Sequence, residues 1–105
     1  MKLDLRQLER VANLFRAFGE GTRLAIIQEL KEGELGVSEI VERLTTSQAN
    51  ISKQLKLLYE AGLVSHRKQG SQVLYQIADP MVFELCQLVC DKLNRDAARP
   101  AKLRF

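Results

Sequence analysis

The spacing of hydrophobic residues changes near Gly62 and constrains the fold more than any other feature of this chain. Before Gly62, apolar residues recur every three or four positions, which is typical of amphipathic helices. After it, two short stretches flank Gly70, and in the second Val73, Tyr75 and Ile77 share one face, as in a β-strand. Helical spacing returns at Pro80. The order predicts a mainly helical fold with one β-hairpin.

The expected elements are four helices, two strands and a final helix. We expect Ser38 and Asp79 to cap helix N-termini, since short polar side chains accept from free backbone N–H groups. Gly62 is expected to end the fourth helix. The predicted helices cover residues 3–18, 22–31, 38–44, 48–61 and 80–96, and the predicted strands cover 63–68 and 72–77.

A helix–turn–helix followed directly by a hairpin predicts a winged helix–turn–helix. With 105 residues the chain can form one modest hydrophobic core. We expect one domain over residues 1–98, with dimerisation helices at both ends, and a loose basic tail over 99–105. No signal peptide or membrane span is expected, which favours a cytoplasmic protein without a membrane partner.

Positive charge is concentrated in the middle of the chain. Residues 47–78 carry four basic side chains and one acidic one, whereas residues 1–46 carry seven basic and eight acidic ones. Such asymmetry is typical of proteins that bind nucleic acid.

The fourth helix is the predicted DNA-reading element. If Ile51, Leu55 and Leu58 face inward, a short, polar and basic face points outward. Asn and Gln can pair with adenine, and Lys can contact phosphate or guanine. An ordinary solvated helix face is the alternative. The residues expected to contact DNA from this helix are Ser47, Gln48, Asn50, Ser52, Lys53 and Lys56, and from the hairpin tip Arg67, Lys68, Gln69 and Ser71.

The apolar surface of the last helix indicates that the protein has a second subunit. Apolar residues from Val82 to Leu93 cover more than half of its circumference, so its own subunit can bury only one side. A homodimer would cover the other side, with Phe15 and Phe18 of the first helix as companions.

Residues 22–27 (TRLAII), 47–58 (SQANISKQLKLL), 61–64 (AGLV) and 70–75 (GSQVLY) resemble the ArsR/SmtB family in order and spacing. The similarity extends from about residue 8 to residue 93. It implies a homodimeric transcriptional repressor that binds a palindromic double-stranded DNA operator and is released by an inducing signal. It also implies that Ser47, Gln48, Asn50, Ser52 and Lys53 lie at the DNA groove.

Two effector sites of that family are not expected here. The positions that match its paired cysteines before the recognition helix are Gly36 and Ser38, which supply no thiolate. Where the zinc-type site of the last helix would lie, only Asp79 can ligate, and a lone carboxylate does not hold zinc. We therefore expect that the protein requires no cofactor, and no residue is predicted to be a metal ligand.

Cys86 and Cys90 are the remaining candidates for an effector site. A disulfide within one helix is unfavourable at this spacing, so we expect free thiols. The pair could bind a thiophilic metal or metalloid, or react with an oxidant or reactive sulfur species. Alternatively, both residues only pack, and the protein is an effector-independent repressor.

No constellation of nucleophile, base and cleft is recognisable, so the chain is not expected to be an enzyme. A winged-helix protein-interaction module is a further alternative to a DNA-binding repressor. His66 is expected to be a strand or DNA-facing side chain rather than a metal ligand.

Overall fold

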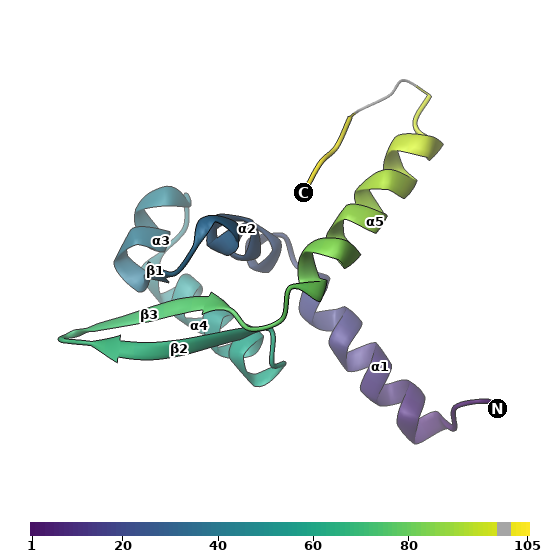
Figure 1. The fold of residues 1–105 in the computed structure, drawn as a ribbon, viewed down its shortest axis with the longest axis horizontal. Coiled ribbons are helices and arrows are strands. Elements are labelled where there is room, and N and C mark those ends of the chain that lie inside the picture. The colour runs from purple at the N-terminus through teal and green to yellow at the C-terminus, as the bar shows by residue number, and fades with distance from the viewer. Residues whose placement is uncertain (99–101) are drawn as a thin grey trace.

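The computed structural model describes residues 1–98 and 102–105 and confirms a mainly helical winged helix–turn–helix architecture (Figure 1). It adds a short 3₁₀ helix and one strand to the expected order. The elements are α1 (Leu5–Phe18), α2 (Gly21–Glu29), η1 (Leu30–Glu32), β1 (Leu35–Gly36), α3 (Val37–Arg43), α4 (Gln48–Glu60), β2 (Val64–Gln69), β3 (Gln72–Ile77) and α5 (Met81–Asp96).

The hydrophobic core lies between α2, α3, α4, the sheet and the start of α5. The expected inward stripe of α4 is confirmed, because Ile51, Leu55 and Leu58 are all fully buried. The core fixes α4 against α2 and α3 while the opposite side of α4 stays exposed. The large, fully buried side chains are Ile26, Ile27, Ile40, Ile51, Leu55, Leu58 and Val82.

The sheet has three antiparallel strands in the order β1–β3–β2. β2 and β3 form the expected hairpin, which closes at the Gln69–Gln72 pair. Gly70 in this turn has φ +64°, a conformation that glycine adopts without steric cost. The two-residue strand β1 was not predicted, because its pairing of Leu35 with Tyr75 is a backbone contact without a side-chain period.

The start of α3 differs from expectation. Ser38 does not cap this helix; Gly36 is the N-cap, and Glu39 Oε1 accepts its backbone N–H at 3.1 Å. The helix starts early because Gly36 ends β1 and the chain passes directly from strand to helix. Asp79 is not the N-cap of α5 either, because that position belongs to Pro80. Its Oδ1 nevertheless accepts the backbone N–H of Met81, the first residue of the helix, at 3.0 Å.

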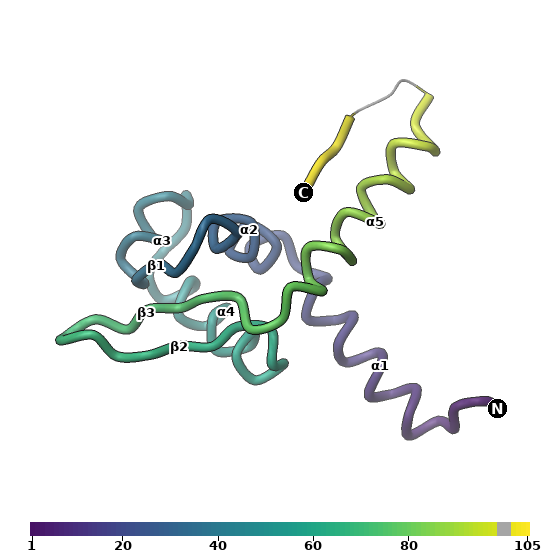
Figure 2. The backbone as a smooth tube through the Cα atoms, viewed as in Figure 1, coloured from purple at the N-terminus to yellow at the C-terminus, as the bar shows by residue number. Residues whose placement is uncertain are grey.

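Helices α1 and α5 extend away from the rest of the domain (Figures 1 and 2). Both leave apolar side chains exposed. On α1, Leu5 is 76% exposed and Phe15 61% exposed. On α5, Leu88, Val89 and Leu93 are 64%, 53% and 51% exposed. Within the described ranges, no helix is both long and apolar enough to cross a membrane.

The described C-terminal residues, 102–105, make hydrogen bonds to the domain, which the expectation of a loose tail did not include. Asn94 on α5 accepts the Leu103 N–H at 2.7 Å and donates to the Leu103 carbonyl at 2.9 Å. The Phe105 N–H donates to Gln87 Oε1 at 3.0 Å, and Lys31 Nζ donates to the Phe105 carbonyl at 2.8 Å. Backbone groups of the tail therefore bind α5 and η1. The rest of the predicted tail, residues 99–101, lies outside the described residues.

Two leucines of α4 provide a matched test of this packing. Leu55 is fully buried and Leu57 is 41% exposed. We expect Leu55→Ala to lower the free energy of unfolding by about 2–5 kcal/mol through lost contacts and a cavity. Leu57→Ala is expected to lower it by less than about 1 kcal/mol. Urea unfolding followed by circular dichroism at one protein concentration measures both, and equal losses would contradict this packing.

Candidate nucleic-acid interface

The residue directly before α4 caps the N-terminus of this helix. Ser47 is the N-cap, and its hydroxyl accepts the backbone N–H of Asn50 at 3.1 Å. Such a cap stabilises a helix start by about 1 kcal/mol. Ser47 is exposed as expected, but its side-chain oxygen is already engaged by the helix.

Four α4 residues that are predicted to contact DNA lie on the exposed side of this helix. Gln48, Ser52, Lys53 and Lys56 are all exposed. Their side chains have no hydrogen bond or ion pair within the described part of the chain. Because α4 carries no acidic residue before Glu60, this face is polar and positively charged.

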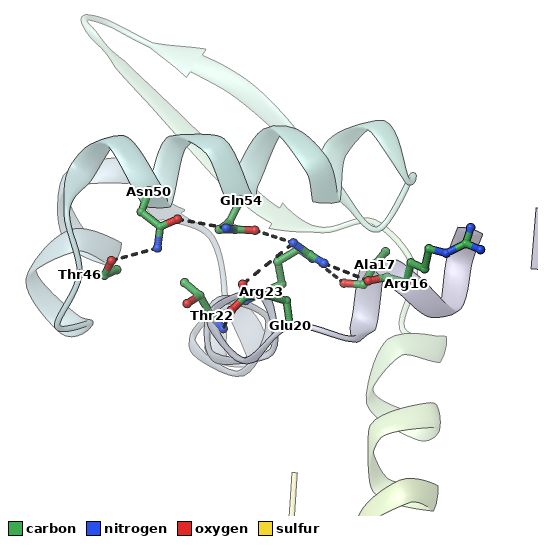
Figure 3. Close-up of polar contacts among 8 residues, drawn as sticks. All are labelled: Arg16, Ala17, Glu20, Thr22, Arg23, Thr46, Asn50 and Gln54. Atoms are coloured by element: carbon green, nitrogen blue, oxygen red, sulfur yellow. Dashed lines mark hydrogen bonds and ion pairs between the residues drawn. The ribbon is translucent and has the colours of Figure 1, made fainter. Parts of the chain in front are cut away.

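Asn50 lies differently from the expected outward position. It is half-buried, and its carboxamide is bonded on two sides (Figure 3). Its Nδ2 donates to Thr46 Oγ1 at 3.0 Å, and its Oδ1 accepts from Gln54 Nε2 at 3.0 Å. The side chain sits at the edge between the core and the exposed face, in one fixed orientation.

The chain of hydrogen bonds continues from Asn50 into the body of the domain. Gln54 Oε1 accepts from Arg23 Nη1 at 2.6 Å. The same guanidinium donates from Nε to the Ala17 carbonyl at 2.8 Å and from Nη2 to the Arg16 carbonyl at 2.9 Å (Figure 3). Arg23 therefore connects the C-terminal end of α1 to α4.

Sequence reasoning missed both Arg23 and Gln54 as members of the site. Gln54 is only 7% exposed, and among the described residues it is the one polar side chain that is classed as buried. Its position supplied a signal, because it lies three residues after Ile51 and four before Leu58, on the buried stripe. A polar side chain there needs a hydrogen-bond partner, although the sequence does not identify which residue provides it.

The hairpin residues that are predicted to contact DNA differ in whether they are bonded within the domain. Lys68, Gln69 and Ser71 are exposed around the turn. Arg67 instead binds Glu34, from Nε to Oε2 at 3.1 Å and from Nη2 to Oε1 at 2.5 Å, and it donates to Gln69 Oε1 at 3.1 Å. These bonds lower the pKa of Glu34 below its ordinary value and raise that of Arg67. Arg67 is thus held against the domain rather than extended at the tip.

Aromatic side chains connect the hairpin to α4. The ring centroid of His66 lies 4.4 Å from that of Tyr59 on α4 and 5.3 Å from that of Tyr75 on β3. Desolvation by burial raises the pKa of Tyr75. His66 is exposed on β2, and its contacts are those of a packed strand residue.

The two cysteines are free thiols on α5, as expected. Cys86 is buried, and that burial, followed by the effect of neighbouring Cys90, raises the pKa of its thiol. Cys90 is half-buried. Both line an apolar cavity of about 230 Å³ beside Phe15, Phe18, Leu24, Leu85, Val89, Leu93 and Phe105. Over residues 1–98 and 102–105, no group of three or more His, Cys, Asp or Glu side chains is placed to hold a metal ion.

Comparison with known proteins identifies the type of domain. Residues 20–66, which contain α2, α3 and α4, match the family described as bacterial regulatory protein, arsR family. A helix–turn–helix-type transcriptional regulator from Methanocaldococcus jannaschii is 40% identical over 81% of this chain and 97% of its own length. The chain belongs to the ArsR family.

Two further relatives agree with this assignment. A probable mercury resistance operon repressor from Streptomyces lividans is 36% identical over 76% of this chain and 64% of its own length. A homodimeric winged helix–turn–helix DNA-binding domain from Mycobacterium bovis, a possible ArsR-family regulator, superposes with a TM-score of 0.76. The two are 29% identical, and the match covers 93% of this chain and 95% of that domain. This ArsR-type protein is a transcriptional repressor with a winged helix–turn–helix DNA-binding domain, and its family is not enzymatic.

The Arg67–Glu34 pair leads to a prediction about the hairpin. Glu34→Gln removes the charge that holds Arg67, so we expect tighter binding to duplex DNA. The plot of log affinity against log salt should steepen by about 0.9 for one added phosphate contact. Glu32→Gln is the control, because it removes the same charge from an exposed neighbour. Fluorescence anisotropy over a range of salt concentrations measures both, and identical slopes would show that Arg67 does not reach DNA.

Proposed function

We propose that this ArsR-family protein represses transcription by binding a palindromic duplex operator as a homodimer. In this proposal α4 enters the major groove, and the β2–β3 turn follows the phosphate backbone. The exposed, acid-free face of α4 around Lys53 carries the proposal. Short polar side chains on this face can approach base edges, and its lysines can neutralise phosphates.

The uncovered helices support a homodimer. Apolar side chains of α1 and α5 are exposed in the single chain, and residues of both helices line one apolar cavity. A second copy of the chain would remove these surfaces from water, which favours association. A two-fold axis through these helices would present two α4 helices to successive major grooves, about 34 Å apart. The relative from Mycobacterium bovis is itself homodimeric.

Lys53→Ala tests the role of α4. We expect weaker binding to all duplexes and a salt slope that is shallower by about 0.9, because one phosphate contact is lost. Lys92→Ala is the control; it removes the same charge from the exposed side of α5, where Lys92 pairs with Asp96. Anisotropy on promoter DNA gives affinity and slope, while sedimentation checks the dimer. Equal effects of the two substitutions would remove α4 from the interface.

We further propose that Cys86 and Cys90 form the input site of the repressor. They lie one helical turn apart on α5, at the cavity between α5 and α1. Two thiolates there suit a soft, thiophilic metal or metalloid, and the Streptomyces lividans relative is named for mercury resistance. The burial and raised pKa of Cys86 favour the competing interpretation, in which the cysteines only pack and no effector acts.

Thiol reagents separate these two interpretations. Mercuric ion or arsenite, which bridge two sulfurs, should release wild-type protein from DNA, and Cys86→Ser or Cys90→Ser should each abolish that release. Because the pKa of Cys86 is raised, reaction at this residue should accelerate as the pH rises above neutrality. Anisotropy on promoter DNA with each reagent is the measurement, and Cys86→Ala controls for packing. Tight binding that is indifferent to every reagent would assign both cysteines to packing.

A further inference from the structure

Arg23, whose side chain can only donate, begins a series of hydrogen bonds that reaches Asn50 through Gln54 (Figure 3). The Arg23 guanidinium has N–H donors and no acceptor. Its side chain is only 13% exposed, and it is held by the carbonyls of Arg16 and Ala17. Whatever faces this guanidinium must therefore accept a hydrogen bond.

This requirement fixes the orientation of the next side chain. Gln54 must turn its Oε1 to Arg23, and this oxygen lies 2.6 Å from Arg23 Nη1. Its Nε2 then faces Asn50, to which it donates at 3.0 Å. A carboxamide has nearly the same shape in both orientations, so packing alone does not distinguish them; the donors and acceptors around it do.

The orientation passes on to Asn50. Because Gln54 donates, Asn50 must present Oδ1 to it, and its Nδ2 then faces Thr46 Oγ1. The threonine hydroxyl can donate or accept, so it does not select an orientation. After these two bonds, the carboxamide of Asn50 keeps one N–H and one oxygen lone pair for another partner.

We propose that Arg23 and Gln54 are positioning residues for base recognition. They fix which part of the Asn50 carboxamide is the donor and which is the acceptor, and so which base it accepts in the major groove. The inference rests on the proposed role of α4 in binding DNA. Asn pairs with adenine by accepting from N6 and donating to N7. A reversed carboxamide meets that base with donor against donor and acceptor against acceptor.

Gln54→Glu tests the orientation directly. A carboxylate still accepts from Arg23 but cannot donate to Asn50. The Asn50 carboxamide is then expected to reverse, with Nδ2 toward the introduced carboxylate and the Thr46 hydroxyl donating to Oδ1. The ion pair with Arg23 retains the link to α1. We therefore expect a folded dimer whose preferred base changes at one position of each half-site.

Gln54→Met tests the link without reversing it. Methionine has a similar length but leaves Asn50 without a donor and free to rotate. Discrimination at the Asn50-dependent base position should fall by about 5- to 150-fold, the range for losing one bidentate base contact. In an Asn50→Ala background, Gln54→Met should have no further effect at that position, because Gln54 acts through Asn50.

The measurement is the affinity of each variant for a panel of duplexes that differ by single base pairs from the site selected by wild type. Gln28→Glu, at an exposed position of α2, controls for the added charge. It should shift all affinities together without changing base order. Circular dichroism and sedimentation confirm the fold and the dimer. Folded Gln54→Glu and Gln54→Met dimers with unchanged base preference at every position would overturn the inference.

The result also separates this inference from the proposed function. If Asn50→Ala leaves the base preference intact, the role of Asn50 in reading DNA fails. If Asn50→Ala changes it and the Gln54 variants do not, only the positioning role fails. Should neither Gln54 variant fold, side-chain amide NMR of the wild-type dimer decides. The Gln54 amide protons should show NOEs to Asn50, and the Asn50 amide protons to Thr46; the reverse pattern would overturn the inference.

Discussion

Helix α4 is held by the hydrophobic core on one side and exposed on the other, and the rest of the structure depends on this division. Ile51, Leu55 and Leu58 are fully buried, and each large apolar side chain contributes about 1.5–3 kcal/mol when it leaves water. An exposed ion pair contributes at most about 1 kcal/mol. The core therefore fixes α4 without help from its outer face. That face can carry Lys53 and Lys56 at little cost in stability.

Packing positions α4 but does not orient its carboxamides, because the two ends of an amide differ in hydrogen bonding rather than in shape. The polar chain supplies this second level of order. Arg23 binds carbonyls at the end of α1 and also binds Gln54 within α4. It therefore joins a helix whose apolar side is exposed in the single chain to the helix proposed to read DNA. Because Gln54 is buried, its side chain must keep its hydrogen-bond partners. An unsatisfied polar group there would cost about 1–3 kcal/mol.

In contrast to α4, the helices at the two ends of the chain, α1 and α5, are only partly covered by the core. Apolar residues of α1 and α5 satisfy the helical period, yet much of their surface has no partner within the chain. Cys86 and Cys90 belong to this region, so their chemistry depends on what covers the cavity that they line. The described tail residues bind α5 through backbone groups, which a basic composition does not predict. Composition does not indicate whether backbone donors and acceptors will find side-chain partners.

The sequence by itself determined the order of the main helices and the hairpin, the buried stripe of α4 and the exposed lysines, because hydrophobic period and glycine positions act locally. It did not indicate β1, whose two residues pair through backbone atoms alone. It also placed Arg67 at a free hairpin tip and Asn50 fully outward. The tertiary structure decided both, by bringing Glu34 beside Arg67 and Gln54, held by Arg23, beside Asn50. Hydrogen bonds depend on the distance and direction between atoms, and for residues 31 to 33 positions apart only the folded core sets these.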